Sequence, residues 1–284
     1  MAIPKKVSER LAAGIRRFQP VLASAKARDV NESDTVIIVT DMLSEVFGYD
    51  KYSEITSELC IRGTYCDLAI KLDSKLRFLI ECKAIGADLK DSHIKQAVDY
   101  AANQGIEWVG LTNGIHWRIY RITFAQPIDS ELVEEIDFMS LNPKVTAHLE
   151  SLYLLAKEGL TKSVLEEYHQ QRQAMSRFFL GAMVVSDPVL EVLRRELRRV
   201  SPGVRIELEE LREALVDEVI KRDVMEGDRA ADAKRKIARA QNRSSRSRKG
   251  DEQAQVAPVV IPAPIPPPSV PPPAAGGASA TPTA

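Results

Sequence analysis

The sequence predicts an α/β domain followed by an α-helical region and a disordered C-terminal tail. Alternating apolar and polar residues mark short strands within the first 125 residues, and apolar residues at helical spacing recur between about 143 and 220. The last 58 residues hold ten of the chain's sixteen prolines. We therefore expect a domain with a helical leader at residues 1–125, a helical appendage at 126–226, and a basic, then proline-rich, disordered tail at 227–284.

Charge and composition narrow the functional classes. Residues 221–284 carry eleven Lys and Arg against six Asp and Glu, an excess of five positive charges. Because the whole chain has a net charge of −1, the first 220 residues carry a net charge of −6. A body this acidic does not bind polyanions in general. No apolar run has the length of a membrane helix, and the N-terminal residues lack the pattern of a signal peptide, so we expect a cytoplasmic protein. Cysteines 60, 66 and 82 have no metal-binding spacing and indicate reduced core thiols.

A β-hairpin is predicted at the centre of the first domain. Residues 64–72 and 76–83 alternate between apolar and polar side chains around the polar segment 73–75. A three-residue loop sets Leu72 against Leu76 and Asp67 directly against Glu81, on one face of the sheet, with Lys83 one pleat further on. A two-residue loop would place Asp67 opposite Ile80, on the wrong face.

Two carboxylates that face each other across a sheet repel unless a cation lies between them. Magnesium suits such a site because it takes carboxylate and carbonyl oxygens, keeps several waters and binds beside substrate phosphates. The alternative is a solvated sheet face on which Asp67 and Glu81 pair with Lys71 and Lys83.

The segment after the hairpin extends the pattern. Asp91 and Ser92 are suitable caps for a helix that places Gln96 and Tyr100 on one face. Asp67, then Glu81-x-Lys83, then Gln96-x-x-x-Tyr100 resembles the PD-(D/E)XK nuclease core, and most closely the N-terminal domain of type I restriction enzyme R subunits, over roughly residues 25–125. Cys66 stands where the motif's name has proline.

The resemblance implies a restriction-endonuclease-like mixed sheet flanked by helices, and a site for Mg²⁺ or Mn²⁺. It implies metal ligation by Asp67, Glu81 and the backbone carbonyl of Cys82, and a role for Lys83 in polarising water and opposing phosphate charge. It further implies that Gln96 and Tyr100 orient these groups. An acidic residue of the first domain helix joins the metal in related nucleases. Glu32 is the best positional match, with Asp34 and Asp41 as rivals.

The remaining helices and strands are predicted from the spacing of apolar residues and from residues that favour turns. We expect a leader at 4–28 interrupted at Pro20, a helix that begins at Asn31 or Ser33 and closes at Gly48, and an edge strand at 52–59. Residues 108–112 and 116–123 are expected to form the last two strands, joined by Asn113-Gly114. Three or four helices are expected after residue 143.

The resemblance predicts a metal-dependent DNA endonuclease in restriction or phage defence. The sequence contains no G-x-x-x-x-G-K-[ST], so either separate subunits supply the motor and the sequence recognition, or the chain is a stand-alone relative with a different task. The basic segment 234–249, with Lys234, Arg235 and Lys236, is expected to attract phosphate, together with Lys83. A non-catalytic interaction module with the same fold, and an RNA or repair nuclease, remain alternatives.

Overall fold

A computed structural model describes residues 2–61, 64–124 and 127–254, with side chains at 58–65 and from 242 onward left out. The chain divides into two compact units, one up to Ser176 and one that begins at Arg177. Within the described residues no helix is both long and apolar enough to cross a membrane.

The first unit is built on a six-stranded mixed sheet with the strands in sequence order. All neighbouring strands are antiparallel except β3 and β4, which are parallel and joined through η1 (Asp91–Ile94) and α3 (Lys95–Gln104). The strands are β1 (Ile55–Ile61), β2 (Thr64–Leu72), β3 (Lys75–Cys82), β4 (Trp108–Thr112), β5 (His116–Thr123) and β6 (Asp129–Asp137). The α/β class and the mixed sheet flanked by helices are confirmed.

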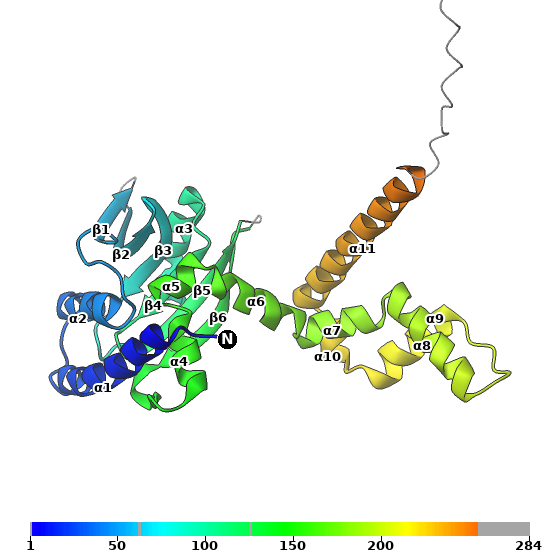
Figure 1. Ribbon diagram of the computed structural model, residues 1–284, viewed down its shortest axis with the longest axis horizontal. Coiled ribbons are helices and arrows are strands. Elements are labelled where there is room, and N and C mark those ends of the chain that lie inside the picture. Colours follow the sequence, from blue (N-terminus) through cyan, green and yellow to red (C-terminus); the bar gives the residue numbers. More distant parts are fainter. Residues whose placement is uncertain (1, 62–63, 125–126, 255–284) are drawn as a thin grey trace, which may run out of the picture. The chain divides into compact units, whose positions relative to one another are not determined.

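Helices cover both faces of this sheet (Figure 1). One face packs against α1 (Lys5–Ala27), α2 (Glu32–Glu45) and α4 (Thr146–Tyr153) around a large apolar cluster that includes Leu68 and Ile80. The other face packs against α3 (Lys95–Gln104) in a smaller cluster. The remaining elements of the unit are η1 (Asp91–Ile94), η2 (Phe138–Ser140), α5 (Lys157–Thr161) and α6 (Val164–Ala174).

Two features of the first unit differ from the sequence expectation. The leader helix runs without interruption through Pro20, and its buried stripe includes Phe18 and Leu22 on either side of the proline. β6 was not predicted, because five of its nine residues are acidic and only Val133 and Ile136 are buried. The compact unit that holds the sheet extends to Ser176.

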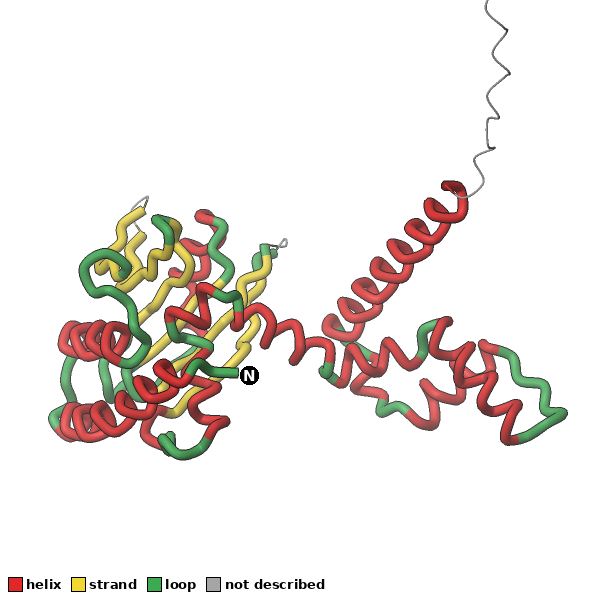
Figure 2. The backbone as a smooth tube through the Cα atoms, viewed as in Figure 1, coloured by secondary structure: helices red, strands yellow, loops and turns green. Residues whose placement is uncertain are grey.

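The second unit contains only helices and loops among its described residues (Figure 2). They are α7 (Arg177–Val184), α8 (Asp187–Val200), α9 (Leu208–Ala214), the π-helical turn η3 (Leu215–Val219), α10 (Arg222–Met225) and α11 (Asp228–Ala254). The helical region is confirmed, although the described residues after 143, from α4 onward, hold more helices than the three or four expected. The proline-rich residues 255–284 lie outside the described residues.

The basic segment at 234–249 is helical, contrary to the expected disorder. Half of its residues are Arg or Lys, which have high helix propensity. Ala233 and Ile237 of α11 are buried against Ala182 of α7, with Phe178 and Phe179 packed beside them. This apolar contact stabilises the helix, and the composition of the segment did not predict it.

The central hairpin reaches its register by an unexpected route. Leu72 pairs with Lys75, so the turn has two residues, Asp73 and Ser74, both with positive φ as in a type I′ turn. The three-residue loop was therefore the wrong prediction. A β-bulge follows, in which Arg77 is the additional residue, and Ile70 then pairs with Phe78. Because the bulge shifts the register by one residue, it restores the pairing that a three-residue loop would have given.

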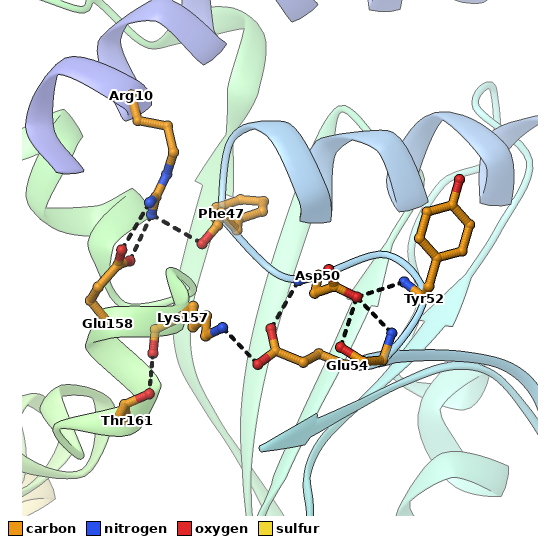
Figure 3. A network of polar contacts seen from close by, with 9 residues as sticks. Arg10, Phe47, Asp50, Tyr52, Glu54, Lys157, Glu158 and Thr161 are labelled. Atoms are coloured by element: carbon orange, nitrogen blue, oxygen red, sulfur yellow. Dashed lines mark hydrogen bonds and ion pairs between the residues drawn. The ribbon is translucent and has the colours of Figure 1, made fainter. Parts of the chain in front are cut away.

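A polar network fastens helices of the first unit to one another (Figure 3). Arg10 on α1 donates to both carboxylate oxygens of Glu158 on α5, at 2.8 and 2.7 Å, and to the carbonyl oxygens of Val46 and Phe47. The side chains of Arg10 and Glu158 are only 27% and 33% exposed. This hydrogen-bonded pair therefore joins α1, the end of α2 and α5.

The partly buried pair predicts a stability loss that an exposed pair does not give. Arg10→Met should lower the free energy of unfolding by about 2–3 kcal/mol, since Glu158 loses a charged donor. Arg17→Met, on the same helix but in an exposed pair with Glu45, should cost less than about 1 kcal/mol. Equal losses in urea unfolding would contradict this interpretation.

The same pair predicts a pH dependence. The hydrogen bond from Arg10 lowers the pKa of Glu158. Its stabilisation is therefore fully present above the ordinary glutamate pKa of about 4.3, and is lost as pH falls through the lowered value. The unfolding free energies of wild type and Arg10→Met should accordingly converge in acid.

Candidate metal and nuclease site

The candidate site begins at Glu81, the last residue but one of β3. Its side chain is buried, with 8% of the residue exposed. Glu81 Oε1 accepts a hydrogen bond from Lys83 Nζ at 2.8 Å, and Oε2 is buried without a hydrogen-bond partner among the described residues. Burial raises the pKa of Glu81, the charge of Asp67 adds to the effect, and the hydrogen bond from Lys83 opposes it.

Asp67 lies on the neighbouring strand at the point where the β2–β3 ladder ends. The last pair of the ladder is Leu68 with Ile80, and the same register carried one residue further sets Asp67 across from Glu81. Asp67 is half-buried, and its Oδ2 accepts a hydrogen bond from the backbone N–H of Cys82 at 2.7 Å. The carboxylate of Asp67 thus accepts the backbone N–H of Cys82 in place of a strand carbonyl, and it is held beside Glu81.

Lys83 follows β3 directly and connects two carboxylates. Its Nζ lies 2.8 Å from Glu81 Oε1 and 3.4 Å from Glu32 Oε2, and the side chain is 20% exposed. Burial by itself lowers the pKa of Lys83, but the hydrogen bond and charge of Glu81, with Glu32 and Asp67, outweigh it, so this pKa is raised. Lys83 is therefore held as a cation among three acidic side chains.

Glu32 is brought to this site by the first turn of α2. Asn31 caps the helix, and its side chain accepts from the backbone N–H of Asp34 at 2.9 Å. Of the two rivals, Asp41 pairs with Lys51 at 2.7 Å, and Asp34 carries the capped N–H. Only Glu32 among the three is paired with Lys83 in the part of the chain that the structure describes.

The helix that follows presents its two motif residues differently. Tyr100 is buried within the smaller apolar cluster, and Gln96, one turn earlier, is exposed. Tyr100 therefore faces the sheet, while Gln96 stands at the surface of α3. Their roles in orienting the site remain predictions.

The two described cysteines flank the acidic pair and are free and buried. Cys66 packs in the smaller cluster, whereas Leu68 packs in the large one. The Cys66 thiol donates to the carbonyl oxygens of Leu68 and Ile80. Burial raises the pKa of Cys66 to about 12, so the thiol stays protonated. The side chain of Cys60 lies outside the described residues.

The basic residues of α11 belong to the second unit. Lys234, Arg235 and Lys236 are exposed, and Arg235 pairs with Asp232 one turn earlier. The buried positions of this stretch are Ala233 and Ile237. The three basic side chains therefore leave the apolar contact of α11 undisturbed.

The donor set fits a hard divalent cation. Asp67 and Glu81 supply two carboxylates, and the buried Glu81 Oε2 has no hydrogen-bond donor among the described residues. Within the described ranges no group of three or more His, Cys, Asp or Glu side chains is arranged to hold a metal ion. Magnesium needs fewer, because it is commonly bound by one or two carboxylates and keeps several waters.

Sequence reasoning did not single out the side chains that fasten the segment after Lys83. Asn113, Arg118 and Tyr120 each hydrogen-bond to that segment from the β4–β5 hairpin. The sequence pattern identifies Asn113 only as a turn residue. Its burial in the structure, at 3% exposure, is the signal that it does more.

Residues 38–136 match the family model described as type I restriction enzyme R protein N terminus (HSDR_N). No match was found among curated proteins or among solved structures. The matched segment contains Asp67, Glu81 and Lys83, and it confirms the resemblance noted in the sequence. The family indicates a restriction-related nuclease domain.

The buried carboxylate predicts that the site opposes folding when no divalent metal is present. Because the pKa of Glu81 is raised, the folded state holds more protons than the unfolded state between about pH 4.3 and that raised value. Wild-type stability should therefore fall as pH rises through this window, and Glu81→Gln should escape the fall. The measurement is urea unfolding in chelator between pH 4 and 7.

Glu32→Gln is the control, since that side chain is 49% exposed and should shift stability by less than about 0.5 kcal/mol. A Glu81→Gln protein whose stability relative to wild type stays constant over this pH range would rule out the buried charge as the cause.

Proposed function

We propose that this chain is a metal-dependent endodeoxyribonuclease of a restriction system. The observation that carries the proposal is the group formed by Glu81, Lys83, Asp67 and Glu32 at the end of the β2–β3 hairpin, most of it inside the segment that matches the R-protein family. A buried glutamate with an orphan oxygen beside a lysine has no structural need in an apolar core. It has a use where a cation and a phosphate must be bound.

In this proposal Asp67, Glu81 and the backbone carbonyl of Cys82 hold Mg²⁺ or Mn²⁺, and Glu32 contributes from α2. The bound ion supplies a nucleophilic hydroxide at neutral pH and Lewis-acid stabilisation of the phosphate. Lys83, already fixed against Glu81 Oε1, is placed to orient the attacking water and to oppose the negative charge that develops on the phosphate. Gln96 and Tyr100 orient the substrate and the sheet end from α3.

The proposed substrate is DNA, because the matched family is described as part of a restriction enzyme. The proposed partners are separate motor or specificity subunits. The acidic first 220 residues offer little general attraction to phosphate. Lys234, Arg235 and Lys236 on α11 are proposed to supply it.

Cleavage of duplex DNA in magnesium or manganese tests the proposal directly. Glu81→Ala should reduce cleavage below detection, and Lys83→Met should reduce it about 10²–10³-fold while metal binding persists. Lys95→Met, which removes an exposed lysine at the start of α3, is the matched control and should cleave like wild type.

Full metal-dependent cleavage by Glu81→Ala would refute the assigned chemistry. Cleavage of RNA but not DNA by wild type would move the protein to the RNA nucleases. The absence of cleavage and of magnesium binding in wild type would favour the non-catalytic module.

The proposed role of α11 predicts a change in salt dependence. Substitution of Lys234, Arg235 and Lys236 by Gln retains helix propensity and leaves the buried Ala233 and Ile237 in place. Each phosphate that the variant no longer neutralises should reduce the slope of log affinity against log salt by about 0.9. An unchanged slope in DNA titrations from about 50 to 200 mM salt would assign these residues another role.

A further inference from the structure

The loop that follows β3, residues 83–90, has contacts that the proposed chemistry does not require. The ladder of β3 ends at Cys82, so Lys83 is the first residue beyond the sheet. The backbone N–H of Lys83 donates to the carbonyl oxygen of Thr112 at 2.8 Å. This one backbone hydrogen bond does not by itself fix the conformation of the chain after Lys83.

A second hydrogen bond fixes the loop further along the chain. The side-chain amide of Asn113 donates from Nδ2 to the carbonyl oxygen of Ala87 at 3.0 Å. Between the two attachments, Ala87 N–H donates to Ala84 O at 2.9 Å and closes a tight turn. Lys83 and Ala87 are thus both bound to consecutive residues, Thr112 and Asn113.

Further contacts continue the attachment toward α3. Arg118 Nη1 donates to Leu89 O at 2.7 Å, and the Tyr120 hydroxyl donates to Asp91 Oδ1 at 3.0 Å. On the opposite side, a Cβ at Gly86 would overlap the carboxylate of Asp29, so the loop also fits closely against the α1–α2 turn.

The other atoms of the Asn113 side chain shape its own hairpin. Oδ1 accepts from the backbone N–H groups of Ile115 at 3.1 Å and His116 at 2.8 Å. Asn113 is 3% exposed, so its amide is enclosed between the hairpin and the loop. The Oδ1 acceptor of Asn113 thus stabilises the turn of the β4–β5 hairpin, and its Nδ2 donor binds the 83–90 loop.

We propose that Asn113 is a positioning residue, whose side-chain amide fixes the 83–90 loop and thereby holds Lys83 against Glu81. Its effect on cleavage rests on the proposed nuclease function, whereas its effect on the placement of Lys83 does not. A displacement of about 1 Å in a reacting group costs as much as 10²-fold in rate, so this attachment matters most for turnover.

Asn113→Asp separates the two functions of the side chain. Aspartate keeps the acceptor that forms the hairpin turn, but it replaces the Nδ2 donor by an oxygen that repels Ala87 O. The matched control is Asn103→Asp, since Asn103 Nδ2 donates to Asp99 O at 2.9 Å on the exposed side of α3, away from the loop. Both variants add one negative charge.

The first measurement is the acylation rate of individual lysines in the intact chain, followed by mass spectrometry with Lys95 as internal reference. Lys83 is 20% exposed and paired, so it should react slowly in wild type and in Asn103→Asp. Its rate should rise at least about fivefold in Asn113→Asp. An unchanged Lys83 rate in a folded Asn113→Asp overturns the proposal, whether or not the wild type cleaves DNA.

The second measurement is cleavage kinetics with magnesium. In Asn113→Asp, kcat should fall about 10–100-fold with KM for duplex DNA within about twofold, a split that general destabilisation does not produce. An unchanged kcat overturns the catalytic part of the inference. If the wild type does not cleave DNA, the proposed nuclease function is wrong. The labelling rate of Lys83 still tests whether Asn113 holds Lys83 in place.

A second variant covers the case in which Asn113→Asp does not fold. Arg118→Met removes the neighbouring attachment at Leu89 O from a side chain that is 25% exposed. It should raise the Lys83 labelling rate at least about threefold. A folded Arg118→Met with wild-type labelling at Lys83 counts against a fixed loop.

Discussion

The structure of the site depends on the burial of one carboxylate. Glu81 is buried at the end of β3, and an ionised group in such a place is costly unless it is paired. Lys83 provides the pairing, Asp67 is held by the N–H of Cys82 on the same edge, and Glu32 reaches Lys83 from α2. In the metal-free protein the lysine thus offsets part of the charge that we propose a divalent ion offsets in the active protein.

Much of the sheet could be predicted from the sequence, because β2 and β5 alternate between apolar and polar residues, and Asn113-Gly114 between β4 and β5 is a strong hairpin signal. The path of the central hairpin could not. Asp73 and Ser74 form a two-residue turn that alone would set Asp67 on the wrong face, and the bulge at Arg77 reverses this. A bulge has no pattern in hydrophobicity, since it depends on how both strands pack on their two helical layers.

Other differences have the same tertiary origin. β6 resembles a polar, acidic loop until its partners are known: Arg118 pairs with Glu135, and Arg172 with Glu134. α11 resembles a solvated basic segment until Ala233 and Ile237 are seen against α7. Asn113 has the pattern of a turn residue, and its second function depends on Ala87, 26 positions earlier in the chain. In each case the deciding contact is with residues distant in sequence.

The central claim is that the carboxylates placed by the bulged hairpin bind one divalent cation beside Lys83. Calorimetric titration of the full chain with magnesium, and then with manganese, tests it most directly. We expect about one ion to bind per chain in wild type. We expect no ion to bind in a folded Glu81→Ala protein. Wild type that binds neither ion, with or without duplex DNA, or Glu81→Ala that binds as tightly as wild type, would contradict it.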